Sequence, residues 1–533
     1  MAVNLTRHTA TFSTSPQISV HDVQEIAALG FKTLVNNRPD GEGGADQPTS
    51  AEIEAAALAL GLNYVHLPVI SGQITEPQAR RFAELLVTSP KPVLAFCRSG
   101  ARSQNLYRMA RGEVAAPQAA PAASACLWGD SHDIVIVGGG SAGIGLAASL
   151  LKRQSNLQIA IIEPSEQHYY QPAWTLVGAG EFNPQASVRS MASVMPKGVT
   201  WIRAAATGFD PDHRKVMLDT GKAIAYQYLV VAPGLKLNWQ AIPGLEETLG
   251  KNGVTSNYRF DLAPTTWSLV QSLKHGRAIF TQPPMPIKCA GAPQKAMYLS
   301  CFEWEKRGLL KDIDVQFHNA GAVLFGVPDF VPPLMSYVKR YHANLHFNSK
   351  LIAIDGPAKK AWFEQKDANG NLVQVEQSFD MIHVVPPQTA PDFVRESPLA
   401  NAEGWVDVNQ LTLQHIRYPD VFSLGDTCSS PNAKTAAAAR KQIVVVAENL
   451  LALRSGEALK TRYDGYGSCP LTVEKGKIVL AEFGFGGKLL PTFPLDPTVP
   501  RKSAWVLKKN VLPWLYWEAM LKGREWLARP LEN

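Results

Sequence analysis

Residues 132–163 read HDIVIVGGGSAGIGLAASLLKRQSNLQIAIIE, and this stretch decides the fold of most of the chain. The apolar run at 134–137 predicts a strand, the glycines after it a tight turn, and the Ala- and Leu-rich residues beyond them a helix. A second apolar run at 158–162 predicts another strand. Strand, glycine-rich turn, helix and strand in this order begin a parallel βαβ unit, so the sequence predicts an α/β fold.

The turn carries three glycines in the spacing G-x-G-x-x-G, namely Gly138, Gly140 and Gly143. The first allows the tight turn, the second lets a pyrophosphate approach the backbone, and the third lets helix and strand pack closely. Glu163 ends the next strand, where a carboxylate can accept hydrogen bonds from ribose hydroxyls. The stretch therefore predicts a site for an adenine dinucleotide, against the alternative of a glycine-rich turn that binds nothing.

Two later segments favour FAD over NAD. Residues 228–234, YLVVAPG, resemble the strand and turn of flavoproteins with two dinucleotide-binding domains, and the turn ends at Gly234. Residues 418–426, YPDVFSLGD, resemble a late motif of the same proteins. That resemblance implies that Asp426 meets the ribityl chain of FAD. The alternative is that Asp426 is only a turn residue.

The glycine-rich turn that such flavoproteins use for NAD(P)H is missing. It should follow the strand expected at 278–280, but residues 281–289 read TQPPMPIKC. The next strand, 314–317, ends in a histidine and an asparagine instead of a ribose-binding acid. The sequence thus predicts a second Rossmann-like domain that has lost its nicotinamide site, so electrons must enter from another donor.

Two cysteines adjoin these flavin-related loops. Cys289 stands in the altered turn and Cys428 stands two residues after Asp426. Their positions suggest a redox-active pair, in which sulfide attacks a sulfur bridge and the released thiolate passes two electrons to a flavin. Lys288 or Lys295 could favour the thiolate. The alternative is that both are buried, inert cysteines. Cys301 and Cys469 are interpreted as structural residues, and Cys126 as incidental because it lies in a linker.

From residue 132 onward the chain resembles the sulfide:quinone oxidoreductases. The resemblance rests on the segments HYYQP (168–172), SNY (256–258), KCAGAPQK (288–295), GWVD (404–407), KTAAA (434–438), YDGY (463–466) and SCPL (468–471). It implies bound FAD, with Gln171 and Lys434 among the cofactor-binding residues. It also implies Cys289 as the cysteine nearer the flavin and Cys428 as the one that receives sulfur. Thr427 departs from the pattern, because many relatives place this cysteine directly after Gly-Asp.

Residues 1–111 predict a separate small α/β domain. Strands are expected at 33–36, 64–68 and 93–96, and helices at 51–60 and 76–86. The third strand enters the loop CRSGARS, which runs from Cys97 past Arg102. The backbone amides of this loop can surround an anion, and together with the following helix they favour a thiolate at Cys97. The four residues between Cys97 and Arg102 resemble a rhodanese loop, whereas the segment RPD at 38–40 resembles a phosphatase-like domain fused to enzymes of sulfur metabolism.

A phosphatase needs an acid to protonate its leaving group. The expected segment, HLPVISG at 66–72, has neither Asp nor Glu. We therefore expect transfer of sulfane sulfur from Cys97 to an anion held by Arg102, with protein phosphatase activity or a non-catalytic docking module as the alternatives.

The predicted division of the chain follows from these motifs. An Ala- and Pro-rich linker is expected at 112–131. The oxidoreductase covers 132–504, with FAD-binding parts at about 132–240 and 400–450 and the degenerate NAD-type domain at about 241–399. Residues 505–533 hold four of the twelve tryptophans, flanked by Lys508, Lys509, Lys522 and Arg524. Such short aromatic and basic helices suit an interfacial membrane segment, although a helix packed on the body is the alternative.

Composition excludes several classes. The net charge of +6 is too small to indicate nucleic acid, no apolar run is long enough to span a bilayer, and the cysteine spacing matches no metal centre. Without an export signal in residues 1–20, we expect a peripheral protein at the cytoplasmic face of a bacterial inner membrane. A homodimer is one of the oligomeric states left open. The partners of the protein would be sulfide, a thiol or sulfite that accepts sulfur, and a membrane quinone. The competing hypotheses are a type II NADH:quinone dehydrogenase and a flavin-binding scaffold without turnover.

Overall fold

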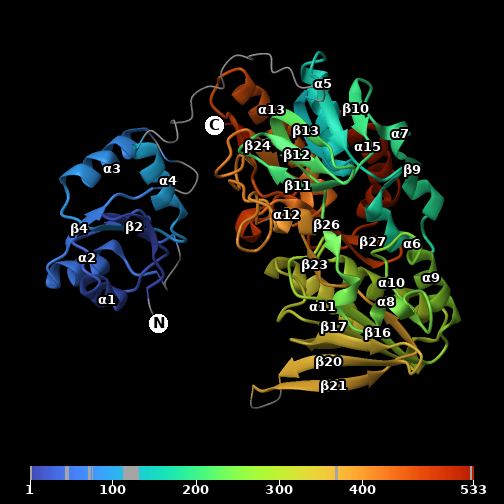
Figure 1. Ribbon diagram of the computed structural model, residues 1–533. Helices are drawn as coiled ribbons and strands as arrows, with labels where there is room; N and C mark the ends of the chain where they lie inside the picture. Colours follow the sequence, from blue (N-terminus) through green and yellow to red (C-terminus); the bar gives the residue numbers. More distant parts are fainter. Residues whose placement is uncertain are drawn as a thin grey trace. The chain divides into compact units, whose positions relative to one another are not determined.

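The computed structural model describes residues 3–42, 47–69, 74, 76–111, 131–366, 370–431, 433–528 and 531–532. The chain divides into two compact units, Met1–Ser124 and Ala125–Asn533 (Figure 1). The predicted linker lies outside the described residues, apart from Ser131, which begins a strand. Each unit is described by itself.

A five-stranded sheet forms the centre of the first unit, in the order β1-β2-β5-β3-β4. β2, β5, β3 and β4 run parallel to one another, and β1 pairs with β2 in antiparallel fashion. Successive residues of β3 and β5 are buried on opposite faces of this sheet, because helices cover both. The elements are β1 (Thr6–Thr9), β2 (Phe12–Ser15), α1 (Asp22–Ala28), β3 (Thr33–Asn36), α2 (Ser50–Ala59), β4 (Asn63–His66), α3 (Glu76–Thr88), β5 (Val93–Phe96) and α4 (Ala101–Ala110).

The second unit begins with the predicted βαβ sequence. β10, β7, β6 and β13 are parallel neighbours, β24 pairs in parallel with β13, and β12 and β11 extend the sheet in antiparallel fashion. Residues 134–137 are almost fully buried, as expected for a strand covered on both faces. The elements are β6 (Ser131–Val137), α5 (Ser141–Arg153), β7 (Ile159–Ile162), β10 (Val199–Ile202), β11 (Ala206–Asp210), β12 (Lys215–Leu218), β13 (Ala223–Val231), β24 (Val421–Ser423) and α13 (Ala436–Arg454).

A second parallel sheet follows, in the order β15-β22-β16-β17-β18, with the small antiparallel sheet β19-β20-β21 beside it (Figure 1). The predicted second Rossmann-like domain is therefore present. Its elements are β15 (Val254–Thr255), α9 (Ala263–Ser272), β16 (Gly276–Gln282), α10 (Ala292–Lys306), β17 (Ile313–Asn319), α11 (Val331–Arg340), β18 (Asn344–Phe347), β19 (Lys350–Asp355), β20 (Lys360–Lys366), β21 (Leu372–Ser378) and β22 (Met381–His383).

The C-terminal region forms a hairpin and two short helices, which are β26 (Gly467–Glu474), β27 (Lys477–Phe483), α14 (Lys502–Val506) and α15 (Leu512–Glu518). One side of this region packs into the core of the first sheet through Tyr516, Trp517 and Met520. The described part of residues 505–533 thus contributes to the folded body, as the alternative interpretation of this segment allowed. No helix in the described part of the chain is both long and apolar enough to cross a bilayer.

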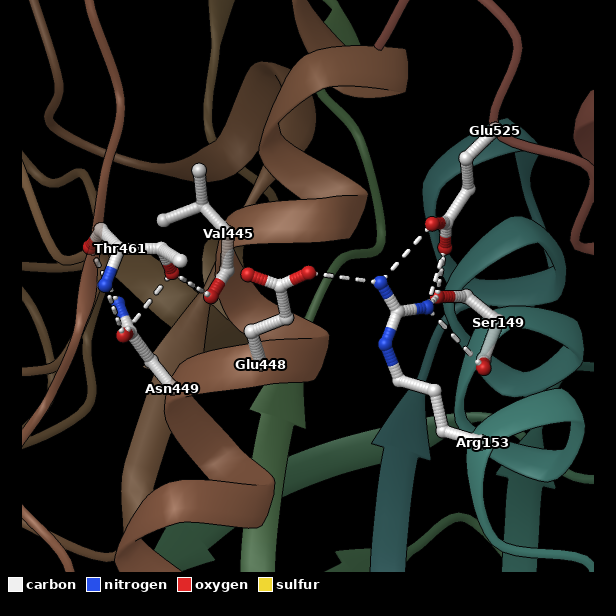
Figure 2. A network of polar contacts seen from close by, with 7 residues as sticks. All are labelled: Ser149, Arg153, Val445, Glu448, Asn449, Thr461 and Glu525. Atoms are coloured by element: carbon white, nitrogen blue, oxygen red, sulfur yellow. Dashed lines mark hydrogen bonds and ion pairs between the residues drawn. The ribbon is translucent and has the colours of Figure 1, made fainter. Parts of the chain in front are cut away.

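A polar network holds the chain's end against the helices of the first sheet. The guanidinium of Arg153 on α5 lies between Glu525 and Glu448, and the hydroxyl of Ser149 donates to Glu525 Oε1 at 2.6 Å (Figure 2). α5 begins at the glycine-rich turn, so the C-terminal residues directly support the helix that carries the predicted dinucleotide site.

Candidate active site

The glycine-rich turn has the geometry that its spacing predicts. Gly138 has φ +107°, and a Cβ there would lie 2.4 Å from Ala232 O. A Cβ on Gly143 would lie 1.9 Å from Gly138 O, whereas a Cβ on Gly140 would meet no heavy atom within 4 Å. The first and third glycines therefore permit close packing, and the second leaves the backbone open to a ligand.

The predicted cofactor residues converge at one edge of the first sheet. β7, β6, β13 and β24 are adjacent and parallel, so Glu163, Gly138, Gly234 and Asp426 follow their carboxyl ends side by side. Glu163 accepts hydrogen bonds from the backbone amides of Gly139 and Ser165, both at 2.8 Å. A ligand commonly binds at this edge of an open parallel sheet.

The loop after β24 is fixed by polar contacts. Gly425 has φ +76°, its N–H donates to Gln442 Oε1 at 2.8 Å, and the Thr427 hydroxyl donates to Gly234 O. Lys434 Nζ donates to Asp426 O at 2.6 Å. Burial raises the pKa of the Asp426 carboxyl. These residues fit a cofactor with ribose and ribityl hydroxyls, which can bond to Glu163 and Asp426.

The predicted cysteine loop reaches this edge from the second sheet domain. Cys289 N donates to Lys434 O at 2.9 Å, and the Tyr258 hydroxyl donates to Lys288 O at 3.0 Å. Lys288 Nζ donates to Gln171 Oε1, and burial lowers the pKa of this lysine to about 8. The structure therefore brings Gln171, Lys434 and Cys289 together.

The sulfur that contacts Cys289 belongs to Cys469. The two Sγ atoms are 3.7 Å apart, and Lys295 Nζ lies 3.2 Å from the Cys289 sulfur and 3.8 Å from the Cys469 sulfur. Cys469 lies in β26, which packs on α10, the helix that begins just after Cys289. The sequence interpretation of Cys469 as a structural residue in a loop missed both the strand and this contact.

Electrostatics favour a thiolate at Cys289. The hydrogen bond from the Cys469 thiol, followed by the charges of Lys295 and Lys508, lowers the pKa of Cys289 well below its ordinary value, against the opposing effect of burial. The same hydrogen bond and burial raise the pKa of Cys469. Lys508, expected at a membrane surface, is instead buried with its ammonium 3.4 Å from Pro470 O. The arrangement thus favours the anionic form of the Cys289 sulfur and the protonated form of the Cys469 sulfur.

Cys428 lies on the loop after β24, and its carbonyl oxygen accepts a hydrogen bond at 3.2 Å from the same Lys434 ammonium that bonds Asp426 O. The Cys428 thiol donates to Gly425 O at 3.2 Å, and it packs in the core of the first sheet, whereas Cys289 and Cys469 pack in the core of the second. Burial raises the pKa of Cys428. Cys301 is buried in α10, where burial likewise raises the pKa of its thiol.

In the first unit, Cys97 directly follows β5 and is buried. Arg102, in the first turn of α4, donates to Val69 O at 2.7 Å and to Glu42 Oε2 at 2.6 Å. The predicted anion-binding arginine is thus at the carboxyl edge of the parallel strands, and a carboxylate of the chain itself contacts it.

Comparison with known proteins agrees with this division of the chain. Residues 4–114 match the model of the phosphatase-like domain of beta-lactamase hydrolase-like proteins, and residues 132–270 match that of pyridine nucleotide-disulphide oxidoreductases. A beta-lactamase hydrolase-like protein of Agrobacterium fabrum is 37% identical over 97 residues, which cover 18% of this chain and 22% of that protein.

The larger unit has closer relatives. The solved sulfide:quinone oxidoreductase of Aquifex aeolicus shares the fold with a TM-score of 0.62 at 21% identity, over 75% of this chain and 96% of that one. The mitochondrial sulfide:quinone oxidoreductase of Dictyostelium discoideum is 43% identical over 399 residues, 74% of this chain and 87% of that protein. With such identity over most of the relative's length, the chain belongs to the sulfide:quinone oxidoreductase family.

Proposed function

We propose that the chain oxidises sulfide at Cys289 and passes two electrons through FAD to a membrane quinone. The observation that carries the proposal is the contact between the Cys289 and Cys469 sulfurs beside Lys295, on a loop tied to the cofactor edge through Lys434. When bound, FAD accepts an electron pair from the thiol site and yields it to a quinone.

In the proposed chemistry, hydrosulfide attacks a disulfide between Cys289 and Cys469. One cysteine becomes a persulfide and the other leaves as a thiolate, so the sulfide sulfur is oxidised while the bridge is reduced. A thiol or sulfite then takes the outer sulfur, and the two thiols re-form the bridge as two electrons leave. Lys295 stabilises Cys289 as the leaving thiolate. We keep Cys428 as a second candidate partner, because it adjoins Asp426.

An anaerobic titration with sulfide tests the proposal. With sulfite present as the sulfur acceptor, flavin absorbance should bleach with about one equivalent of sulfide. Without sulfite, mass spectrometry should find added sulfur on Cys289 or its partner. NADH added in place of sulfide should leave the flavin oxidised. Bleaching by NADH and not by sulfide would support the type II dehydrogenase instead.

The glycine-rich turn gives a first prediction. In Gly143→Ala, the new methyl group would collide with Gly138 O, so the turn must open where the pyrophosphate is expected. We expect the FAD content of the purified protein to fall by about tenfold. Gly208→Ala on β11, where a Cβ would likewise meet no heavy atom within 4 Å, serves as the matched variant away from the turn. Full FAD content in Gly143→Ala, measured by absorbance after denaturation, would contradict the assignment.

For the first unit we propose that Cys97 carries a persulfide and transfers its outer sulfur to an anionic acceptor at Arg102. Support comes from the position of both residues at the carboxyl end of β5, where the first turn of α4 presents free backbone amides. The test is transfer of labelled sulfane sulfur to sulfite by the full chain carrying Cys289→Ser, which removes the sulfur transfer proposed for the second unit. Cys97→Ser added to that variant should abolish the transfer.

We also propose that the exposed side of the C-terminal region binds to a membrane surface without spanning the bilayer. The rings of Trp514 and Trp526 stack 5.6 Å apart and each is 49% exposed, next to the 62% exposed Leu527. Amphipathic aromatic side chains of this kind favour the bilayer interface. The buried side of the same region packs on the body, so the proposal concerns only the exposed side.

The double variant Trp514→Ser/Leu527→Ser tests this surface. Removing two exposed apolar side chains should lower binding to anionic lipid vesicles by about tenfold or more, measured by co-sedimentation. Leu372→Ser on β21 is the control, because Leu372 is equally exposed at 65% but lies on another element. Equal loss in both variants would mean that no specific surface is involved.

A further inference from the structure

Four parallel strands of the first unit end together at one edge. Ser15, Phe96, Asn36 and His66 occupy matching register positions at the ends of β2, β5, β3 and β4. The residues that follow these ends are therefore neighbours, as the hydrogen bond from Asn37 N to Phe96 O shows. Cys97 follows β5, and Arg38 follows β3.

Two arginines of this edge hold the same carboxylate oxygen. Arg38 Nε donates to Glu42 Oε2 at 2.8 Å, and Arg102 Nη2 donates to that oxygen at 2.6 Å. Both guanidiniums are nearly buried, with side-chain exposures of 8% and 9%, while Glu42 is 25% exposed. The anionic group is thus the outermost member of the cluster and can be displaced without opening the core.

The other contacts of the two arginines are neutral. Arg38 Nη1 donates to Gln17 Oε1 at 2.9 Å and Arg102 Nη1 donates to Val69 O at 2.7 Å. Among the contacts of these two arginines within the described residues, Glu42 is therefore the one carboxylate, and both arginines share it. Arginine is suited to such oxyanion contacts because its donors form a fixed fork.

Buried polar atoms beside the arginines add capacity for a ligand. Ser103 Oγ, in the first turn of α4, and Asn37 Oδ1 are buried and have no hydrogen-bond partner among the described residues. Unsatisfied buried polar atoms are costly and commonly mark a missing water or ligand. The Ser103 hydroxyl can donate to an oxyanion at the helix N-terminus, where anions are favoured.

Glu42 does not supply the missing phosphatase acid. Although burial acts in the opposite direction, the hydrogen bonds from Arg102 and Arg38 hold the pKa of Glu42 below its ordinary value. An ionised carboxylate cannot protonate a leaving group at neutral pH. Its position fits an occupant of an anion site better than a catalytic acid.

We infer that Arg38 and Arg102 form an anion-binding site beside Cys97. Glu42 occupies this site in the resting protein, and the sulfur acceptor must displace Glu42. The acceptor class is a small sulfur oxyanion, sulfite or thiosulfate, with two or more oxygens for the two guanidiniums. This inference deepens the proposed sulfur transfer and rests on it for the identity of the anion. It adds Arg38 as a second anion-binding residue and Glu42 as an internal competitor.

Equilibrium dialysis of the full-length, FAD-loaded protein against radiolabelled sulfate tests the proposed anion-binding site. Sulfate is an unreactive oxyanion of the same shape class. We expect Glu42→Gln to bind sulfate about tenfold more tightly than the wild type, because the competing carboxylate is gone. Adding Arg38→Gln to Glu42→Gln should remove this gain. Glu84→Gln is the control, since Glu84 forms an exposed ion pair with Arg81 on α3.

Two results would overturn the inference. One is an affinity of Glu42→Gln equal to that of the wild type, and the other is a gain that persists after Arg38→Gln. Glu42→Ala repeats the test with a smaller side chain if Glu42→Gln is unstable, as judged by circular dichroism. The sulfur-transfer proposal fails separately: undiminished transfer after Cys97→Ser is added to Cys289→Ser would refute it while leaving the sulfate result unchanged.

Discussion

Cys289→Ser should lower the rate of sulfide-driven flavin reduction by about 10³-fold or more, with FAD still bound. A serine hydroxyl ionises far less readily than a thiol and forms no disulfide or persulfide, so both the bridge and the leaving thiolate are lost. The residues proposed to contact FAD are different ones, at the edge of the first sheet. Anaerobic stopped-flow absorbance gives the rate, and the denatured protein gives the FAD content.

The same measurement decides which cysteine is the partner of Cys289. Because the Cys469 sulfur is the one at 3.7 Å, Cys469→Ser should approach the loss seen in Cys289→Ser. Cys428→Ser should retain activity within about tenfold of the wild type, since the hydrogen bond found for its thiol among the described residues goes to Gly425 O and not to Cys289. Cys301→Ser is the control for replacement of a buried cysteine. If Cys428→Ser is inactive and Cys469→Ser is active, the reacting pair is Cys289 and Cys428, as expected from sequence alone.

The cofactor edge could be predicted from sequence because its signals are local. The three glycines, the strand before them and Glu163 lie within a single βαβ unit, and parallel strands bring their carboxyl ends to one edge. The order of motifs was enough to place Gly234 and Asp426 at the same edge. Cys97 and Arg102 could be predicted in the same way, because both lie within one continuous strand, loop and first helical turn.

The thiol pair could not be predicted because its members come from distant parts of the chain. Cys289 and Cys469 are 180 residues apart in sequence and meet only because β26 packs on α10. The segment 468–471 was noted as a family motif, but nothing local showed that its cysteine points toward α10. Lys508 was misplaced for the same reason: a lysine in an aromatic, basic segment looks interfacial until tertiary packing buries it.

The Cys289 site places a positive charge where a helix alone would disfavour it. Lys295 lies in the first turn of α10, near the positive end of the helix dipole, and is almost fully buried. The charge of the nearby Cys289 sulfur raises the pKa of Lys295, although burial opposes this. Burial and Lys295 lower the pKa of Lys508 to about 7, so Lys508 is only partly charged at neutral pH. Lys295 is therefore the cation on which the Cys289 thiolate chiefly depends.

Lys295→Met should lower the rate of sulfide-driven flavin reduction by about 10²-fold at neutral pH. Without the ammonium, the pKa of Cys289 moves back toward its ordinary value, so less thiolate is present at neutral pH and its fraction rises with pH. The activity of the variant should accordingly recover at alkaline pH, whereas the wild-type rate should already be level there. Lys508→Met should show a smaller loss, because that side chain is partly neutral at neutral pH.

Lys295→Arg separates the charge from the side chain's shape, since it keeps a cation and should keep the wild-type position of the pH profile even if crowding lowers the rate. FAD content and thermal unfolding report whether each variant is folded. A Lys295→Met profile that falls uniformly at every pH would show that the lysine acts through packing alone. A profile displaced to higher pH, with FAD bound, is the result expected if the buried ammonium stabilises the reacting sulfur as an anion, and that anion is the leaving group on which the proposed sulfide chemistry depends.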